Sequence, residues 1–167
     1  MNQRRIAILL LCGGALLFFP GRLFILVLEI SDLNADRLVA CARMRPGEEF
    51  TLSYIHSVNR RPVFDTLRAE RDHLVIVRSR FDSFGAGMPE QTTKEGKFRI
   101  AADGWLEWTV NRPLPEITVR VGRMADHKLH LKGKEIRLSD LAEPGTPLRM
   151  SMQRIRFFSY IKNRWML

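Results

Sequence analysis

Residues 50–56 read Phe-Thr-Leu-Ser-Tyr-Ile-His, so that apolar and polar side chains largely alternate. Successive side chains of a strand point to opposite faces, and this period of two predicts a strand with one face in a core. The same alternation recurs in residues 117–122 (Ile-Thr-Val-Arg-Val-Gly) and 148–152 (Leu-Arg-Met-Ser-Met). The body of the chain is therefore expected to be built from strands.

Further strand-like segments lie between and around these, separated by turn sequences such as Pro46-Gly47-Glu48 and Lys132-Gly133-Lys134. We predict strands over residues 23–30, 37–43, 63–71, 74–81, 105–110, 127–131 and 135–138. Short strands roughly ten residues apart, without a strong helical period, indicate an antiparallel sandwich or barrel. We expect an all-β, antiparallel sandwich-like domain, with a break at residues 111–115 and no strand in residues 82–97.

The first 22 residues differ from the rest. Arg4 and Arg5 precede the apolar run Ile6–Phe19, and Pro20-Gly21-Arg22 ends it. A basic start followed by an apolar run is typical of an export signal, and the positive-inside bias keeps its arginines in the cytoplasm. We expect a single-pass inner-membrane protein with most of its chain in the periplasm.

The apolar run lacks the small residues that a cleavage site after it requires, since Gly13, Gly14 and Ala15 lie within it. Lipidation at Cys12 is the weaker alternative, because Leu11 stands where a small residue is needed. An uncleaved anchor helix is therefore the expectation. Its 14 residues span only about 21 Å, against a hydrocarbon core of about 30 Å.

Composition restricts the function further. The chain has 27 Lys and Arg against 18 Asp and Glu, a net charge of +9. The basic residues are spread along the domain without a recognition helix, and together with export this argues against nucleic acid as a partner. Its two cysteines are Cys12 in the apolar run and Cys41 in the body, which excludes a disulfide framework.

These features divide the chain into an anchor (residues 1–22), a periplasmic β domain (23–152) and a basic, aromatic C-terminal tail (153–167). Basic plus aromatic composition is typical of a segment on an anionic membrane surface or a membrane partner. A last strand followed by a frayed end is the alternative. The tail residues that we expect to contact membrane or partner are Arg154, Arg156, Lys162, Arg164 and Trp165.

His56 ends a predicted strand, next to Ser57 and nine positions before Asp65. If Asp65 lies on the neighbouring strand, its carboxylate could hydrogen-bond and orient the imidazole. A His56–Ser57 pair for hydrolysis is disfavoured, because adjacent strand residues face opposite ways and no nucleophile elbow is present. We assign no catalytic residue and take His56, Ser57 and Asp65 as binding candidates.

A second segment, residues 81–89, reads Phe-Asp-Ser-Phe-Gly-Ala-Gly-Met-Pro. Glycine allows a positive φ and a close approach of another group, so this loop either presents N–H groups to an anion or forms a fixed structural crossing. We expect a positive φ at one of the two glycines and add Gly85, Gly87, Met88 and Pro89 to the binding candidates. The remaining histidines show no metal-ligand spacing, and we expect no metal and no cofactor.

These two segments together resemble a bacterial and archaeal family called domain of unknown function 1850. The motifs that carry the resemblance are Tyr54-Ile55-His56-Ser57-Val58, Pro62-Val63 with Asp65, and Gly85-Ala86-Gly87-Met88-Pro89. The family has no established activity. Its genes tend to lie beside those of tripartite ATP-independent periplasmic (TRAP) transporters with a TAXI-type solute-binding protein, so the resemblance implies a role in solute uptake.

We therefore expect a membrane-anchored periplasmic accessory or binding subunit of a TRAP-type solute transporter, without enzymatic activity. Its expected partners are the membrane and the transporter permease, the solute-binding protein, or both of these proteins. The alternative is a hydrolase-like enzyme of the cell envelope that uses His56 and Asp65.

Overall fold

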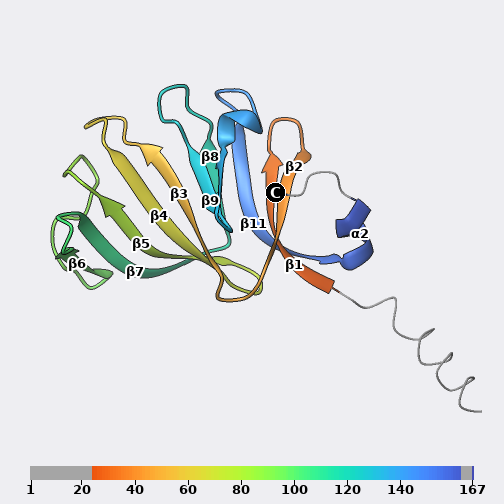
Figure 1. The fold of residues 1–167 in the computed structure, drawn as a ribbon, viewed down its shortest axis with the longest axis horizontal. Helices are drawn as coiled ribbons and strands as arrows, with labels where there is room; N and C mark the ends of the chain where they lie inside the picture. The colour runs from red at the N-terminus through yellow and green to blue at the C-terminus, as the bar shows by residue number, and fades with distance from the viewer. Residues whose placement is uncertain (1–23, 163–166) are drawn as a thin grey trace, which may run out of the picture.

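The structure is a computed structural model that describes residues 24–162 and 167, so the expected anchor lies outside the described residues. The described chain is all-β, with two antiparallel sheets, one 3-10 turn and one short C-terminal helix, which confirms the expected fold class (Figure 1). Between residues 24 and 162, no helix has the length and apolar character needed to cross a membrane.

The smaller sheet has the strand order β2-β1-β11-β8 and the larger one the order β10-β9-β3-β4-β5-β7-β6. The smaller sheet consists of β2 (Arg37–Met44), β1 (Phe24–Asp32), β11 (Pro147–Arg156) and β8 (Glu116–Arg120). The larger sheet consists of β10 (Lys134–Arg137), β9 (Lys128–Leu131), β3 (Glu49–Ile55), β4 (Pro62–Ala69), β5 (Leu74–Phe81), β7 (Leu106–Leu114) and β6 (Gly96–Ile100). The helical elements are η1 (Leu138–Asp140) and α2 (Phe157–Lys162).

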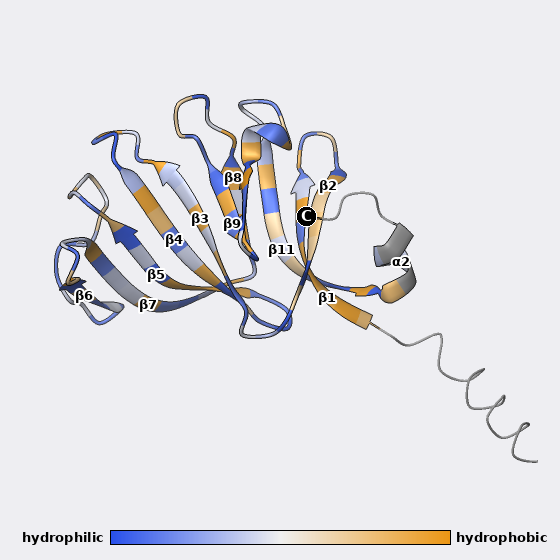
Figure 2. Ribbon diagram, in the orientation of Figure 1, coloured by the Kyte–Doolittle hydropathy of each residue, from blue (hydrophilic) through white to orange (hydrophobic). Residues whose placement is uncertain are grey.

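The main core lies between the two sheets. Leu28 and Leu148 of the smaller sheet and Leu67 and Leu129 of the larger one are fully buried in it. Hydrophobic and hydrophilic residues alternate along the first part of β11, residues 147–152, as the period of two requires (Figure 2). None of the described residues of this core comes from β6 or β7, so the larger sheet extends past it. There a second, smaller cluster forms around Val63, Phe81 and Leu106.

Two predictions about the larger sheet were wrong. Residues 96–97 begin β6, although no strand was expected in residues 82–97. β7 also runs through the predicted break and contains Pro113. The pairing explains why proline is tolerated there: β6 ends its contact with β7 at Val110, so β7 has only one neighbour beyond that point.

The C-terminal strand is longer than expected. β11 continues through Arg156, and its residues 153–156 pair with residues 24–27 of β1. The expected boundary after Met152 therefore lies inside a strand, and Arg154 and Arg156 belong to the sheet. The N–H of Leu167 donates a 3.1 Å hydrogen bond to the carbonyl of Cys41. The tail residues 163–166 lie outside the described part of the chain.

Candidate functional site

Three loops lie at the same end of the strands of the larger sheet, and we call this end the three-loop edge. They are the β3–β4 loop (residues 56–61), the β5–β6 loop (82–95) and the β8–β9 loop (121–127). Because the sheet is antiparallel, β3 and β5 end at the edge where β4 and β9 begin (Figure 1). The two motifs singled out in the sequence are thus neighbours in space.

The β3–β4 loop is fixed by its own hydrogen bonds. The N–H of His56 donates to the carbonyl of Arg61, and the N–H of Arg60 donates to the carbonyl of His56, both at 2.9 Å. The N–H of Val58 donates to His56 Nδ1 at 3.3 Å, so this ring nitrogen acts as an acceptor. Arg60 adopts a φ of 56°, which is uncommon for a residue with a side chain.

Asn59 ties this loop to the β5–β6 loop. Its Nδ2 donates to the carbonyls of Phe84 at 3.0 Å and of Ser83 at 3.3 Å. Arg61 and Asp82 add an ion pair between the same two loops. These contacts hold the two motifs in one fixed arrangement.

The two glycines of the β5–β6 loop have different roles. A Cβ on Gly85 would lie 2.8 Å from Asn59 Nδ2 and 3.3 Å from His56 Cε1, so only glycine fits without a shift. Gly87 has a φ of 81°, which confirms the expected positive φ. The N–H of Met88 donates to the carbonyl of Gly85, closing a turn around Gly87. Met88 then packs on the second cluster, and the half-buried Pro89 follows it.

Asp65 does not contact this loop, and the expected hydrogen bond between His56 and Asp65 was wrong. Asp65 is paired with Leu52 of β3, four residues before His56, which is about 13 Å along a strand. Its carboxylate instead accepts hydrogen bonds from Ser79 Oγ at 2.5 Å and from the hydroxyl of Tyr54. Burial raises the pKa of Asp65, and these two hydrogen bonds offset part of that rise.

The β8–β9 loop closes the other side of the site. The N–H of Ile55 donates to the carbonyl of Ala125 at 2.7 Å. Within the loop, the N–H of Gly122 donates to His127 Nδ1 at 3.3 Å, and a Cβ on Gly122 would lie 2.9 Å from that of Ala125. Burial lowers the pKa of His127, which favours the neutral ring that can accept this hydrogen bond.

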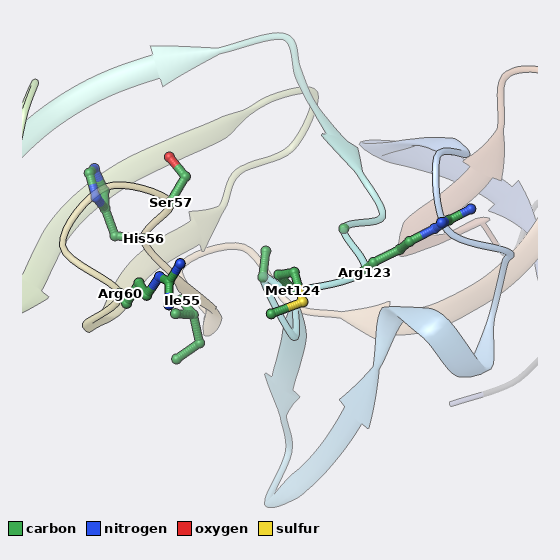
Figure 3. A pocket seen from close by; sticks show the side chains of 8 residues that line it. Ile55, His56, Ser57, Arg60, Arg123 and Met124 are labelled. Carbon is green, nitrogen blue, oxygen red and sulfur yellow. The ribbon is translucent and has the colours of Figure 1, made fainter.

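A pocket of about 460 Å³ lies between the β3–β4 and β8–β9 loops. Figure 3 shows His56, Ser57 and Arg60 on one side and Met124 on the other, with the side chain of Arg123 extending away from the His56 loop. The lining residues are Ile55, His56, Ser57, Arg60, Gly122, Arg123, Met124 and Ala125. Sequence reasoning found His56 and Ser57 but missed Arg123 and Met124, because no pattern within 121–127 links that segment to residue 56.

The chemistry of the pocket suits binding. Its polar groups include an imidazole, a hydroxyl and the Arg60 guanidinium, and no carboxylate lines it. His56 Nδ1 is occupied by a backbone N–H rather than by an orienting acid. In the part of the chain that the structure describes, no group of three or more His, Cys, Asp or Glu side chains could hold a metal ion.

Residues 50–138 match the family model described as Domain of unknown function (DUF1850). The chain belongs to the DUF1850 family. The DUF1850 region covers almost the whole larger sheet and all three loops, whereas β1, β2 and β11 of the smaller sheet lie outside it. No curated protein and no solved structure matches the chain.

Proposed function

We propose that this DUF1850 protein is a non-enzymatic accessory subunit of a TRAP-type solute transporter. It is held in the inner membrane by residues 1–22 and faces the periplasm, where the three-loop edge docks the permease or the solute-binding protein. The observation that supports docking most directly is that each of these three loops exposes a large apolar side chain.

The exposed side chains come one from each loop. Val58 is 67% exposed, Phe84 47% and Met124 85%. Arg60 and Arg123 line the pocket between two of these loops. Exposed apolar side chains with a polar rim are typical of protein-binding surfaces. The hydrogen bonds that fix the loops reduce the entropy that binding has to overcome.

The hydrolase alternative draws no support from the geometry. It requires Asp65 to orient His56, but Asp65 is bonded to Ser79 and Tyr54. The carboxylate of Asp65 therefore does not line the pocket beside His56. Binding at the loop edge therefore remains the preferred function.

Site-specific photocrosslinking in native membranes tests this proposal. A crosslinker placed at position 58 or 124 of the full-length chain should capture a permease or solute-binding protein, identified by mass spectrometry. Leu33, which is 41% exposed in the turn between β1 and β2, is the matched control. Equal capture from position 33, or none from 58 and 124, would contradict docking at this edge.

A functional readout separates docking from incidental contact. The double variant Val58→Asp/Met124→Asp places charges at two of these exposed apolar positions and should reduce both crosslinking and solute uptake. Both positions are exposed, so the β domain should remain folded and membrane-bound. Normal uptake by this variant at wild-type abundance would contradict the proposed function.

A further inference from the structure

A second pocket, of about 320 Å³, lies on the opposite face of the larger sheet from Asp65. Thr51, Thr66 and Arg78 are direct cross-strand neighbours on β3, β4 and β5, so their side chains share one face. Phe50 and Leu67, next to them in sequence, point into the core. The residues that line the pocket are Thr51, Phe64, Thr66, Arg78, Arg80, Asp103 and Trp105.

Arg80 is already paired within the protein. Its Nη2 lies 2.5 Å from Asp103, its Nε lies 3.9 Å from Glu107, and its guanidinium stacks on the Trp105 ring at 5.5 Å. Glu107 is also bonded to Arg99 at 2.6 Å. Around this end of the pocket, three positive charges (Arg78, Arg80 and Arg99) face two negative charges (Asp103 and Glu107). One positive charge is therefore not balanced.

That charge belongs to Arg78. Among residues 24–162 no carboxylate pairs with it, and its Nε, like those of Arg80 and Arg149, is buried without a hydrogen-bond partner. A buried N–H group without a partner is unfavourable, and an observed one requires an explanation. Arg78 is thus a partly buried cation without a counter-charge, at the wall of an open pocket.

The surroundings of Arg78 select the chemistry of a ligand. A guanidinium pairs well with a carboxylate or a phosphate, through two parallel hydrogen bonds. Thr51 Oγ1 and Thr66 Oγ1 lie 3.4 Å apart and offer a further donor. Phe64 and Trp105, with ring centroids 5.7 Å apart, form an apolar wall. The pocket is at the lower end of the size range of small-molecule sites, about 300–1,000 Å³.

We propose that this pocket binds a small carboxylate with an aromatic or apolar body, with its carboxylate on Arg78 and its body against Phe64 and Trp105. The site uses none of the three loops of the docking edge. It goes beyond the proposed function and does not depend on it.

Binding of model compounds to the full-length protein in detergent tests the site. Benzoate is the probe, its neutral isostere benzamide controls for the charge, and the indole N–H resonance of Trp105, assigned with Trp105→Phe, reports on the pocket. Benzoate should shift this resonance and benzamide should not. Arg78→Gln should weaken benzoate binding about tenfold or more, because a bidentate charged pair is lost.

Arg43→Gln is the matched control, since Arg43 is an exposed strand arginine of the smaller sheet. It should bind benzoate as the wild type does. If Arg78→Gln fails to fold, Arg78→Lys is the second variant. It keeps the positive charge but cannot donate two parallel hydrogen bonds, and it should still weaken benzoate binding. Unchanged binding in the Arg78 variants would overturn the site. No shift with benzoate, as expected if the occupant is an acidic side chain of a partner protein, would also overturn it. Inorganic phosphate binding as tightly as benzoate would overturn the carboxylate assignment.

Discussion

Gly85 and Asn59 are in direct contact, and this contact joins the two loops that carry the family motifs. The Asn59 amide reaches the carbonyls of Ser83 and Phe84 only because Gly85 has no side chain: a Cβ there would stand 2.8 Å from Asn59 Nδ2. The Gly-Ala-Gly segment thus admits a side chain of the same protein, rather than an anion, at its first glycine.

Gly85→Ala should destabilise the fold by about 1–3 kcal/mol, because overpacking displaces the Asn59 amide from its two acceptors. Urea unfolding of the wild type and the variant measures this free energy. Asn59→Ala removes the clashing atoms, so Gly85→Ala should have a smaller effect in that background. Equal effects in both backgrounds would show that the contact is not the cause.

Substitution of Gly87 tests the backbone conformation of the loop rather than its steric packing. A Cβ at Gly87 meets nothing within 4 Å, but its φ is 81°. Gly87→Ala should therefore destabilise by about 1–2 kcal/mol, the strain of a left-handed backbone. Gly87→Asn should lose less stability than Gly87→Ala, since asparagine tolerates this conformation better. Thermal unfolding of the three proteins ranks them, and the reverse order of the two variants would refute a conformational cause.

Asp65 should make stability depend on pH. Its pKa is raised in the folded protein by burial. The folded state thus holds the proton more tightly than the unfolded state, whose pKa is about 3.9. Stability from this group is present below that value and falls as pH rises through the folded pKa. Asp65→Asn removes the charge, so its unfolding free energy relative to the wild type should increase from pH 4 upward.

Asp65→Ala leaves the hydroxyls of Ser79 and Tyr54 without their acceptor and should destabilise by about 1–3 kcal/mol. An Asp65→Asn curve parallel to the wild-type curve would mean that Asp65 ionises equally well in both states.

His127 should give the opposite slope. Burial lowers its pKa in the folded protein, against about 6.5 when unfolded. The folded state therefore resists protonation, and the stability that His127 contributes is present above pH 6.5 and is lost as pH falls below it. His127→Gln should flatten the wild-type curve between pH 5 and 7.

Local alternation was sufficient to predict most of this fold. The strand over residues 74–81 was predicted to the residue, because its turn and its apolar ends are both local signals. β6 was missed because its residues are mostly exposed at a sheet edge, so no buried face leaves a pattern. Pro113 was misjudged because its tolerance depends on where the partner strand ends, which is a tertiary fact.

The candidate site was predicted in part. The sequence identified the His56 loop and the glycine loop, but it paired His56 with Asp65, since spacing alone does not fix the register of β3 against β4. Arg123 and Met124 come from a segment more than sixty residues away, and only the sheet topology places them beside His56. Arg78 resembles any solvated strand arginine until its neighbours are known.

The C-terminal segment has two parts: residues 153–156 pair with β1 as the end of β11, and residues 157–167 follow that strand. Deleting residues 153–167 removes the four β11 positions paired with residues 24–27, so it should destabilise the β domain more than deletion of 157–167. The shorter deletion removes Lys162 and Arg164, each worth about 1 kcal/mol at an anionic surface, and should weaken permease co-purification from mild detergent while leaving the unfolding midpoint near that of the full chain. Unfolding of the shorter deletion would place α2 and Leu167 in the essential core, and unchanged co-purification with normal uptake would remove the docking role of this segment.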